Sequence, residues 1–271
     1  MQVLINSMIK IWAFIKRDFL TEVSYRAAFL VQMAGIIFSI LVWYFISKIV
    51  PPDIAELKGL DYFSWVLIGI AFTSYLNTAL NSFARKIRSE QLTGTLEAML
   101  VTPTRTPMVI FSSATWEFIF SSFRVVVYLA LGTFLFNVQV HMESLLAFCI
   151  VLLLTILSFS GIGILSASFI LYFKKGDPIN FFITSVMTLF GGVLFPYEKL
   201  PPYLMKISYF LPITYSLNAI RDALLKGAPL GKLQNEVLIL AIFAIVIVPL
   251  SLLAARFAIR KAKEEGSLIQ Y

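Results

Sequence analysis

The stretch from Leu145 to Phe173, LLAFCIVLLLTILSFSGIGILSASFILYF, decides the fold class, because it contains no charged residue over its whole length. About 20 helical residues cross a hydrocarbon layer roughly 30 Å thick, so this stretch predicts a membrane-spanning helix. Five further stretches are apolar over a comparable length. The sequence therefore predicts an all-α polytopic membrane protein with six transmembrane helices, at residues 28–46, 62–80, 108–136, 145–173, 179–195 and 237–255.

The composition fits a single membrane domain covering residues 1–271. Hydrophobic residues make up 59% of the chain and charged residues 14%, against about 25% charged in a typical soluble domain. Mean hydropathy is +0.86. The net charge of +7 comes from basic residues that flank the apolar stretches, which favours contact with a membrane surface over nucleic acid. We expect no removable signal peptide, because Met1–Arg26 lacks an unbroken apolar core. The lone Cys149 excludes a disulfide within the chain.

The distribution of lysine and arginine predicts the orientation. Fourteen of these residues fall in the N-terminal arm, the 81–107 loop, the 174–178 turn and the C-terminal tail, and seven fall on the other side. Positive charge is enriched on the cytoplasmic side of membrane proteins, so both termini are predicted to be cytoplasmic. Five of the seven opposing residues lie in 197–234, which weakens the prediction without reversing it.

The N-terminal arm, residues 1–26, has the pattern of an amphipathic helix. Its apolar residues recur at helical spacing along one face, with basic residues opposite. Such a basic, tryptophan-containing helix is expected to lie in the membrane interface. Two interpretations stay open: a simple anchor for the first span, or a lever that also contacts a cytosolic partner. The apolar face consists of Leu4, Met8, Ile11, Trp12, Ile15 and Phe19.

The loop between the second and third spans contains a predicted short helix. Gly94 can act as its N-cap, and the residue before Pro103 avoids helical conformation, so the helix has about two turns. Leu96, Met99 and Leu100 form an apolar knob at spacings of three and four. So short a helix is unstable alone in water and must pack against something. It either rests on the bilayer or docks into another protein.

Two charges lie inside the third predicted span, Glu117 and Arg124. They are seven residues apart, and so face nearly the same direction about 10 Å apart along the axis. An unpaired arginine near the bilayer centre costs at least about 2.5–3.5 kcal/mol on insertion scales, which predicts that both face the helix bundle or a dimer partner. They form either a polar patch on a substrate path, where Arg124 would guide an anionic headgroup, or an intramembrane ion pair that locks the fold.

Residues 197–230 have apolar runs too short and too often interrupted by proline to span a membrane. Tyrosines in this segment suit the headgroup region. We predict an outer re-entrant helical hairpin between spans five and six that caps the exit of a path, with Arg221 and Asp222 hydrated. An ordinary surface loop is the alternative.

Two blocks of sequence resemble a known family. The first is Glu90-x-x-x-Gly94-Thr95-Leu96-Glu97-x-x-x-x-Thr102-Pro103. The second runs from Gly191-Gly192-Val193-Leu194-Phe195-Pro196 through Leu200-Pro201 and Leu211-Pro212-Ile213-Thr214-Tyr215 to Ala219-Ile220-Arg221. Both are similar to type-2 ATP-binding-cassette (ABC) exporter permeases, particularly the drug-resistance and lipo-oligosaccharide export branch.

The resemblance covers nearly the whole chain and implies a dimeric pore subunit in a bacterial or archaeal inner membrane. It implies that the loop after the second span is a cytoplasmic coupling helix seated in a separate ATPase, with ATP and Mg on that partner and a second permease copy or a related permease alongside. The expected cargo is amphipathic, lipid-linked or drug-like and moves outward. The implied coupling residues are Glu90, Gly94, Thr95, Leu96, Glu97, Met99, Leu100, Thr102 and Pro103. The implied outer gate comprises Pro196, Pro201, Pro212, Tyr215 and Arg221.

Nothing in the sequence predicts catalysis. The nearest approach to a phosphate-binding loop, Gly227 to Leu233, has three residues between its glycines instead of four and lacks the hydroxyl that holds magnesium. The only histidine, His141, is predicted to be an ordinary surface residue, so we expect no Ser-His pair and no metal site. Two other classes stay open: an ion-gradient-driven secondary transporter, and a non-transporting membrane assembly or immunity factor.

Overall fold

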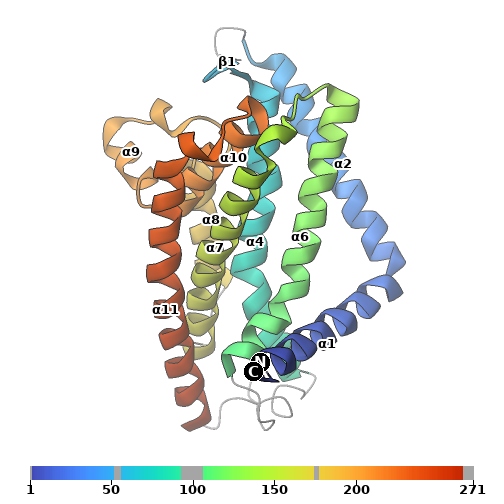
Figure 1. Cartoon of the computed structure of the whole chain (residues 1–271), viewed down its shortest axis with the longest axis vertical. Coiled ribbons are helices and arrows are strands. Elements are labelled where there is room, and N and C mark those ends of the chain that lie inside the picture. The colour runs from blue at the N-terminus through green and yellow to red at the C-terminus, as the bar shows by residue number, and fades with distance from the viewer. Residues whose placement is uncertain (1, 52–55, 93–105, 174–176, 265–271) are drawn as a thin grey trace.

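The computed structural model describes residues 2–51, 56–92, 106–173 and 177–264. Within these ranges, five helices are long and apolar enough to cross a membrane. They stand side by side along the long axis of the molecule (Figure 1). Helices suit this role because each satisfies its own backbone hydrogen bonds where no water is present. Five of the six predicted spans lie inside them: α2 (Arg26–Ile49), α4 (Tyr62–Leu92), α6 (Thr106–Phe136), α7 (Leu145–Phe173) and α11 (Gln234–Glu264).

The predicted span at 179–195 corresponds to a shorter helix, α8 (Asp177–Phe190). Fourteen residues of helix extend about 21 Å, less than the hydrocarbon thickness. The helix ends at Phe190 because Gly192 takes a left-handed conformation, with φ of +77°, that glycine adopts without steric cost. A sixth complete span therefore stays a prediction.

Helix α1 (Gln2–Ser24) lies across one end of the bundle, which we name the α1 end (Figure 1). The chain turns at Tyr25 into α2. The ring of Phe19 meets the ring of Trp116 on α6 edge to face, with centroids 5.5 Å apart. Trp12 and Phe19, on the predicted apolar face, are both exposed. An N-terminal helix with an exposed apolar face is what the pattern predicted.

Helix α4 is the centre of the core, packed between α6 and α7. Its Val66, Leu67 and Tyr75 are fully buried. Gly163 of α7 brings the two backbones into direct contact, since a Cβ there would lie 1.8 Å from the carbonyl oxygen of Ala79 on α4. A small residue thus allows the close approach of two membrane helices at this point. Gly35 of α2, in contrast, has open space around it within this chain.

The opposite end of the bundle carries the short elements. A two-residue hairpin, β1 (Glu56–Leu57) and β2 (Leu60–Asp61), pairs antiparallel there. The other elements are η1 (Met142–Ser144), η2 (Tyr197–Lys199), α9 (Pro202–Ser208), α10 (Pro212–Lys226) and η3 (Leu230–Lys232). Helix α10 packs against α4, α7 and α11, and most of its residues are buried. Such burial is not typical of an ordinary surface loop, while entry of this segment into the bilayer stays a prediction.

Candidate functional site

The two charges of α6 face the same side of the helix, as predicted, but they do not contact each other. Arg124 donates from Nη2 to Oε1 of Gln32 on α2 at 3.1 Å. Its guanidinium lies over the ring of Phe120, 4.7 Å from the centroid. Among the ion pairs between described residues, none joins Glu117 to Arg124. The arrangement thus gives no direct support to a locking ion pair.

Both charges line a cavity of about 350 Å³, which we name the polar chamber. It lies between α4 and α6, closed on one side by Gln32 of α2 and Glu22 of α1. Amides and charged groups dominate its wall, an unusual set of side chains inside a helical membrane bundle. The residues that line the polar chamber are Glu22, Gln32, Asn77, Thr78, Asn81, Arg85, Trp116, Glu117, Phe120 and Arg124.

A seam of hydroxyl groups fixes α6 against α4 beside this chamber. The hydroxyls of Thr78 and Ser121 hydrogen-bond at 2.6 Å, and Tyr75 Oη donates to Ser122 Oγ, also at 2.6 Å. These bonds fix the orientation of α6 about its own axis, so that Arg124 points into the polar chamber. Ser121 and Ser122 lie between the two charges in the sequence, and in the structure both hydrogen-bond to side chains of α4.

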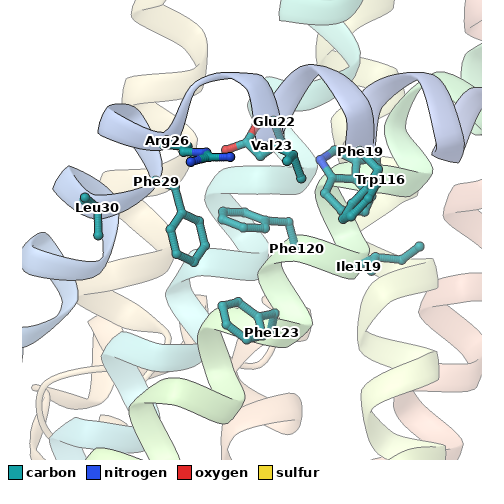
Figure 2. A pocket seen from close by; sticks show the side chains of 10 residues that line it. All are labelled: Phe19, Glu22, Val23, Arg26, Phe29, Leu30, Trp116, Ile119, Phe120 and Phe123. Carbon is teal, nitrogen blue, oxygen red and sulfur yellow. The ribbon is translucent and has the colours of Figure 1, made fainter.

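A second cavity, of about 600 Å³, adjoins the polar chamber, and we name it the apolar cavity. It lies between α1, α2 and α6 (Figure 2). The rings of Phe29, Phe120 and Phe123 gather on one side of it, and those of Phe19 and Trp116 on the other. Its lining residues are Phe19, Glu22, Val23, Arg26, Phe29, Leu30, Trp116, Ile119, Phe120 and Phe123. No feature of the sequence pattern alone indicated this cavity.

The prediction that Arg221 is hydrated is wrong. Its side chain is 1% exposed and donates to three backbone carbonyl groups. Nη1 donates to Gly192 at 2.8 Å, Nη2 to Val193 and Trp65 at 3.0 Å each, and Nε to Trp65 at 3.2 Å. The guanidinium also stacks on the Trp65 ring at 3.7 Å. Arg221 therefore ties α10 to α4 and to the turn after α8. The carbonyl groups of Gly192 and Val193 lie beyond the end of α8, so Arg221 supplies the hydrogen bonds that no helical N–H gives them.

The other predicted gate residues occupy the same region without converging on one point. Pro196 is buried before η2, Pro201 precedes α9, and Pro212 is the buried first residue of α10. Tyr215 donates from its hydroxyl to the backbone oxygen of Tyr209 at 3.0 Å. Nearby, burial and the neighbouring Glu198 carboxylate raise the pKa of Tyr197 to about 12, which keeps that phenol neutral.

His141 is half-buried in the short connection between α6 and η1. Its backbone N–H donates to the carbonyl of Leu224 on α10 at 2.7 Å. Gly227, in a left-handed conformation at the end of α10, lies against its side chain. The described residues contain no cluster of three or more metal-ligating side chains.

Most of the predicted coupling residues lie outside the part of the chain that the structure describes. Glu90 falls in the last turn of α4. Gly94, Thr95, Leu96, Glu97, Met99, Leu100, Thr102 and Pro103 belong to 93–105, beyond the described residues.

The model of the ABC-2 type transporter family matches residues 9–225, most of the chain. This chain belongs to that family. ABC-2 proteins are membrane subunits of transporters and not catalytic subunits, and they generally work with an ABC ATPase subunit. This ABC-2 permease is a multi-pass helical protein of the cell inner membrane.

Two relatives from Escherichia coli K12 have similar sequences. The inner membrane transport permease YadH is 25% identical over 180 residues, which cover 66% of this chain and 70% of YadH. The probable multidrug ABC transporter permease YbhR is 25% identical over 150 residues, which cover 55% of this chain and 40% of YbhR.

Proposed function

We propose that this ABC-2 permease is the membrane subunit of an exporter. It would couple ATP hydrolysis by a separate nucleotide-binding subunit, which holds the ATP and Mg, to outward movement of an amphipathic, lipid-linked or drug-like substrate. The observation that carries the proposal is the polar chamber with Glu117 and Arg124 beside an aromatic-lined cavity. Together they form a site at membrane depth for a molecule with a polar and an apolar part.

In this proposal the α1 end faces the cytoplasm, in keeping with the excess of basic residues there. Substrate enters at the two cavities near that end. It leaves past the segment from Pro196 to Arg221, which acts as the outer gate. Helix α2 presents exposed apolar side chains such as Val31, Phe38 and Val42, and we propose that lipid covers part of this face and a second permease copy or a related permease the rest.

The apolar knob of Leu96, Met99 and Leu100 is proposed to dock into the ATPase. The test replaces Leu96 and Leu100 with aspartate, with a matched control that carries isoleucine at both positions. Permease and ATPase are co-expressed, purified and reconstituted in liposomes, and ATP hydrolysis and ATP-dependent transport are both measured. The aspartate variant should insert into the membrane normally but lose transport and substrate-stimulated hydrolysis, because a charge cannot enter an apolar groove unpaired.

Normal co-purification and transport by the aspartate variant would show that the docking assignment is wrong. Transport that follows an imposed proton or sodium gradient without ATP would instead support the secondary-transporter class.

A further inference from the structure

The polar chamber and the apolar cavity share part of their walls. Glu22, Trp116 and Phe120 line both of them. The two cavities therefore adjoin at these three side chains, and both lie in the half of the bundle nearest α1. A molecule with a polar headgroup and a hydrocarbon tail that reaches past these side chains occupies both.

The apolar cavity suits a hydrocarbon tail. Its wall is aromatic and aliphatic, and its two charged residues, Glu22 and Arg26, both come from the junction of α1 and α2 (Figure 2). A tail that moves from lipid into such a cavity leaves one apolar environment for another, so the hydrophobic effect contributes little affinity. The shape of the cavity limits which tails fit. Contacts to the headgroup must provide most of the selectivity.

The charges of the polar chamber are balanced. Two cations, Arg85 and Arg124, face two anions, Glu22 and Glu117. None of the ion pairs between described residues joins any two of these four side chains. Both carboxylates attract the Arg124 charge and Arg85 repels it, so the four groups act on one another across the space. A purely anionic headgroup would meet two repelling carboxylates, and a purely cationic one would meet two repelling guanidinium groups.

Arg124 has unused capacity to donate hydrogen bonds. A guanidinium carries five N–H donors. In the described structure one of them bonds to Gln32, while Nε is buried and has no hydrogen-bond partner. A buried donor left in this state costs free energy that a bound acceptor would recover. The neighbouring amides Asn77 and Asn81 offer further donors and acceptors to the same ligand.

We propose that the two cavities form one binding site for an amphiphile with a zwitterionic headgroup. The anionic group of the headgroup binds Arg124, its ammonium group binds Glu117, and its tail lies in the apolar cavity between Phe29, Phe123 and Ile119. Arg124 alone would suggest an anionic headgroup. The balance of charge in the polar chamber favours a zwitterionic one. That the bound molecule is a transported substrate rests on the proposed permease function. Binding itself can be measured without transport.

The test uses tryptophan fluorescence, since Trp116 lies in the shared wall. The full-length permease in dodecylmaltoside micelles is titrated with brominated lysophosphatidylcholine, which is zwitterionic, or with brominated lysophosphatidylglycerol, which is anionic. Bromine on the tail quenches a tryptophan that it contacts. Exposed Trp12 will be quenched by either lipid in the micelle, and the variant Trp116→Phe measures that background.

We expect a saturable quenching component with the zwitterionic lipid that is absent in Trp116→Phe and at least tenfold weaker with the anionic lipid. This ranking opposes non-specific binding, because a protein of net charge +7 attracts anionic lipid. Arg124→Gln and Glu117→Gln should each raise the apparent Kd for the zwitterionic lipid at least tenfold. Arg124→Lys, which keeps the charge, should retain part of the affinity. Arg260→Gln, on an exposed arginine of α11, is the matched control and should bind as the unmodified protein does.

Each variant is first compared with the unmodified protein by size-exclusion chromatography, and Arg124→Lys keeps the test decisive if Arg124→Gln does not fold. Equal saturable quenching by both lipids, stronger quenching by the anionic one, or unchanged affinity in Glu117→Gln and the Arg124 variants would overturn the site. The titration contains neither ATPase nor ATP. Normal binding combined with no ATP-dependent transport in liposomes would therefore count against the proposed permease function and leave the binding site standing.

Discussion

Replacement of Arg221 by methionine should destabilise the permease more than any change to an exposed charge. Methionine has a similar length and no donor, so it leaves the carbonyl groups of Trp65, Gly192 and Val193 without the hydrogen bonds that Arg221 gives them. Each buried acceptor left unpaired costs about 1–3 kcal/mol, while removal of the buried guanidinium relieves part of its desolvation. The two carbonyl groups that lie outside a helix, those of Gly192 and Val193, together account for about 2–6 kcal/mol, and we expect about 3–5 kcal/mol once the relieved desolvation is included.

The assay is thermal unfolding of the purified permease in detergent, followed by size-exclusion chromatography of heated samples. For a chain of this size, 1 kcal/mol corresponds to about 2–4 °C in Tm, so Arg221→Met should lower Tm by about 6–20 °C. Lys226→Met is the matched control on the same helix. Lys226 pairs with Asp222 at 2.9 Å at a partly exposed position, where such pairs contribute about 0.2–1 kcal/mol.

The variant Arg221→Lys sharpens the measurement. Lysine keeps the positive charge but cannot direct donors at three separate carbonyl groups from a planar fork. The Tm of Arg221→Lys should be close to that of Arg221→Met if the hydrogen-bond geometry matters. It should be close to that of the unmodified protein if charge alone matters. A Tm of Arg221→Met within 2 °C of the Lys226→Met control would refute the reasoning.

Two further outcomes follow from the fold. Gly163→Ala should destabilise the bundle by about 1–3 kcal/mol through a clash with α4, whereas Gly35→Ala, at an open position, should be neutral or slightly stabilising; thermal unfolding of the two variants compares them directly, and equal stability would contradict the close contact. A single cysteine placed at Lys174, in a chain lacking Cys149, should react with an impermeant reagent only after the cell membrane is opened, whereas one at His141 should react in intact cells. Labelling of position 174 from outside would reverse the orientation inferred from the basic residues.

The long helices could be predicted from sequence because their signal is local. A run such as 145–173, with no charge over its length, has few stable alternatives in a membrane, and α7 spans the same residues. The N-terminal helix was predictable for a similar reason, since its apolar residues repeat at the helical period.

The partners of the buried charges could not be predicted, because they come from distant segments. Arg221 was expected to be hydrated, yet it donates to Trp65, 156 positions earlier in the chain. Arg124 meets Gln32 across 92 positions. Arg221 lies in a segment of short apolar runs interrupted by prolines, and such a pattern predicts an interfacial residue. Only the arrangement of the helices shows that it is buried. The two cavities were unpredictable for the same reason, since their walls combine side chains from α1, α2, α4 and α6.

Helix α2 contributes only two buried side chains to the interior, Ile36 and Ile40. In hydrocarbon, an aliphatic side chain that faces lipid loses little relative to one that faces another helix, so α2 is held in place weakly. Helix α6, in contrast, is fastened to α4 by its hydroxyl seam. The space between α2 and α6 is thus bounded by one firmly held helix, α6, and one weakly held helix, α2. Outward tilting of α2 would enlarge this space without unfolding any segment, and we infer that ligands of different width fit the same site in this way.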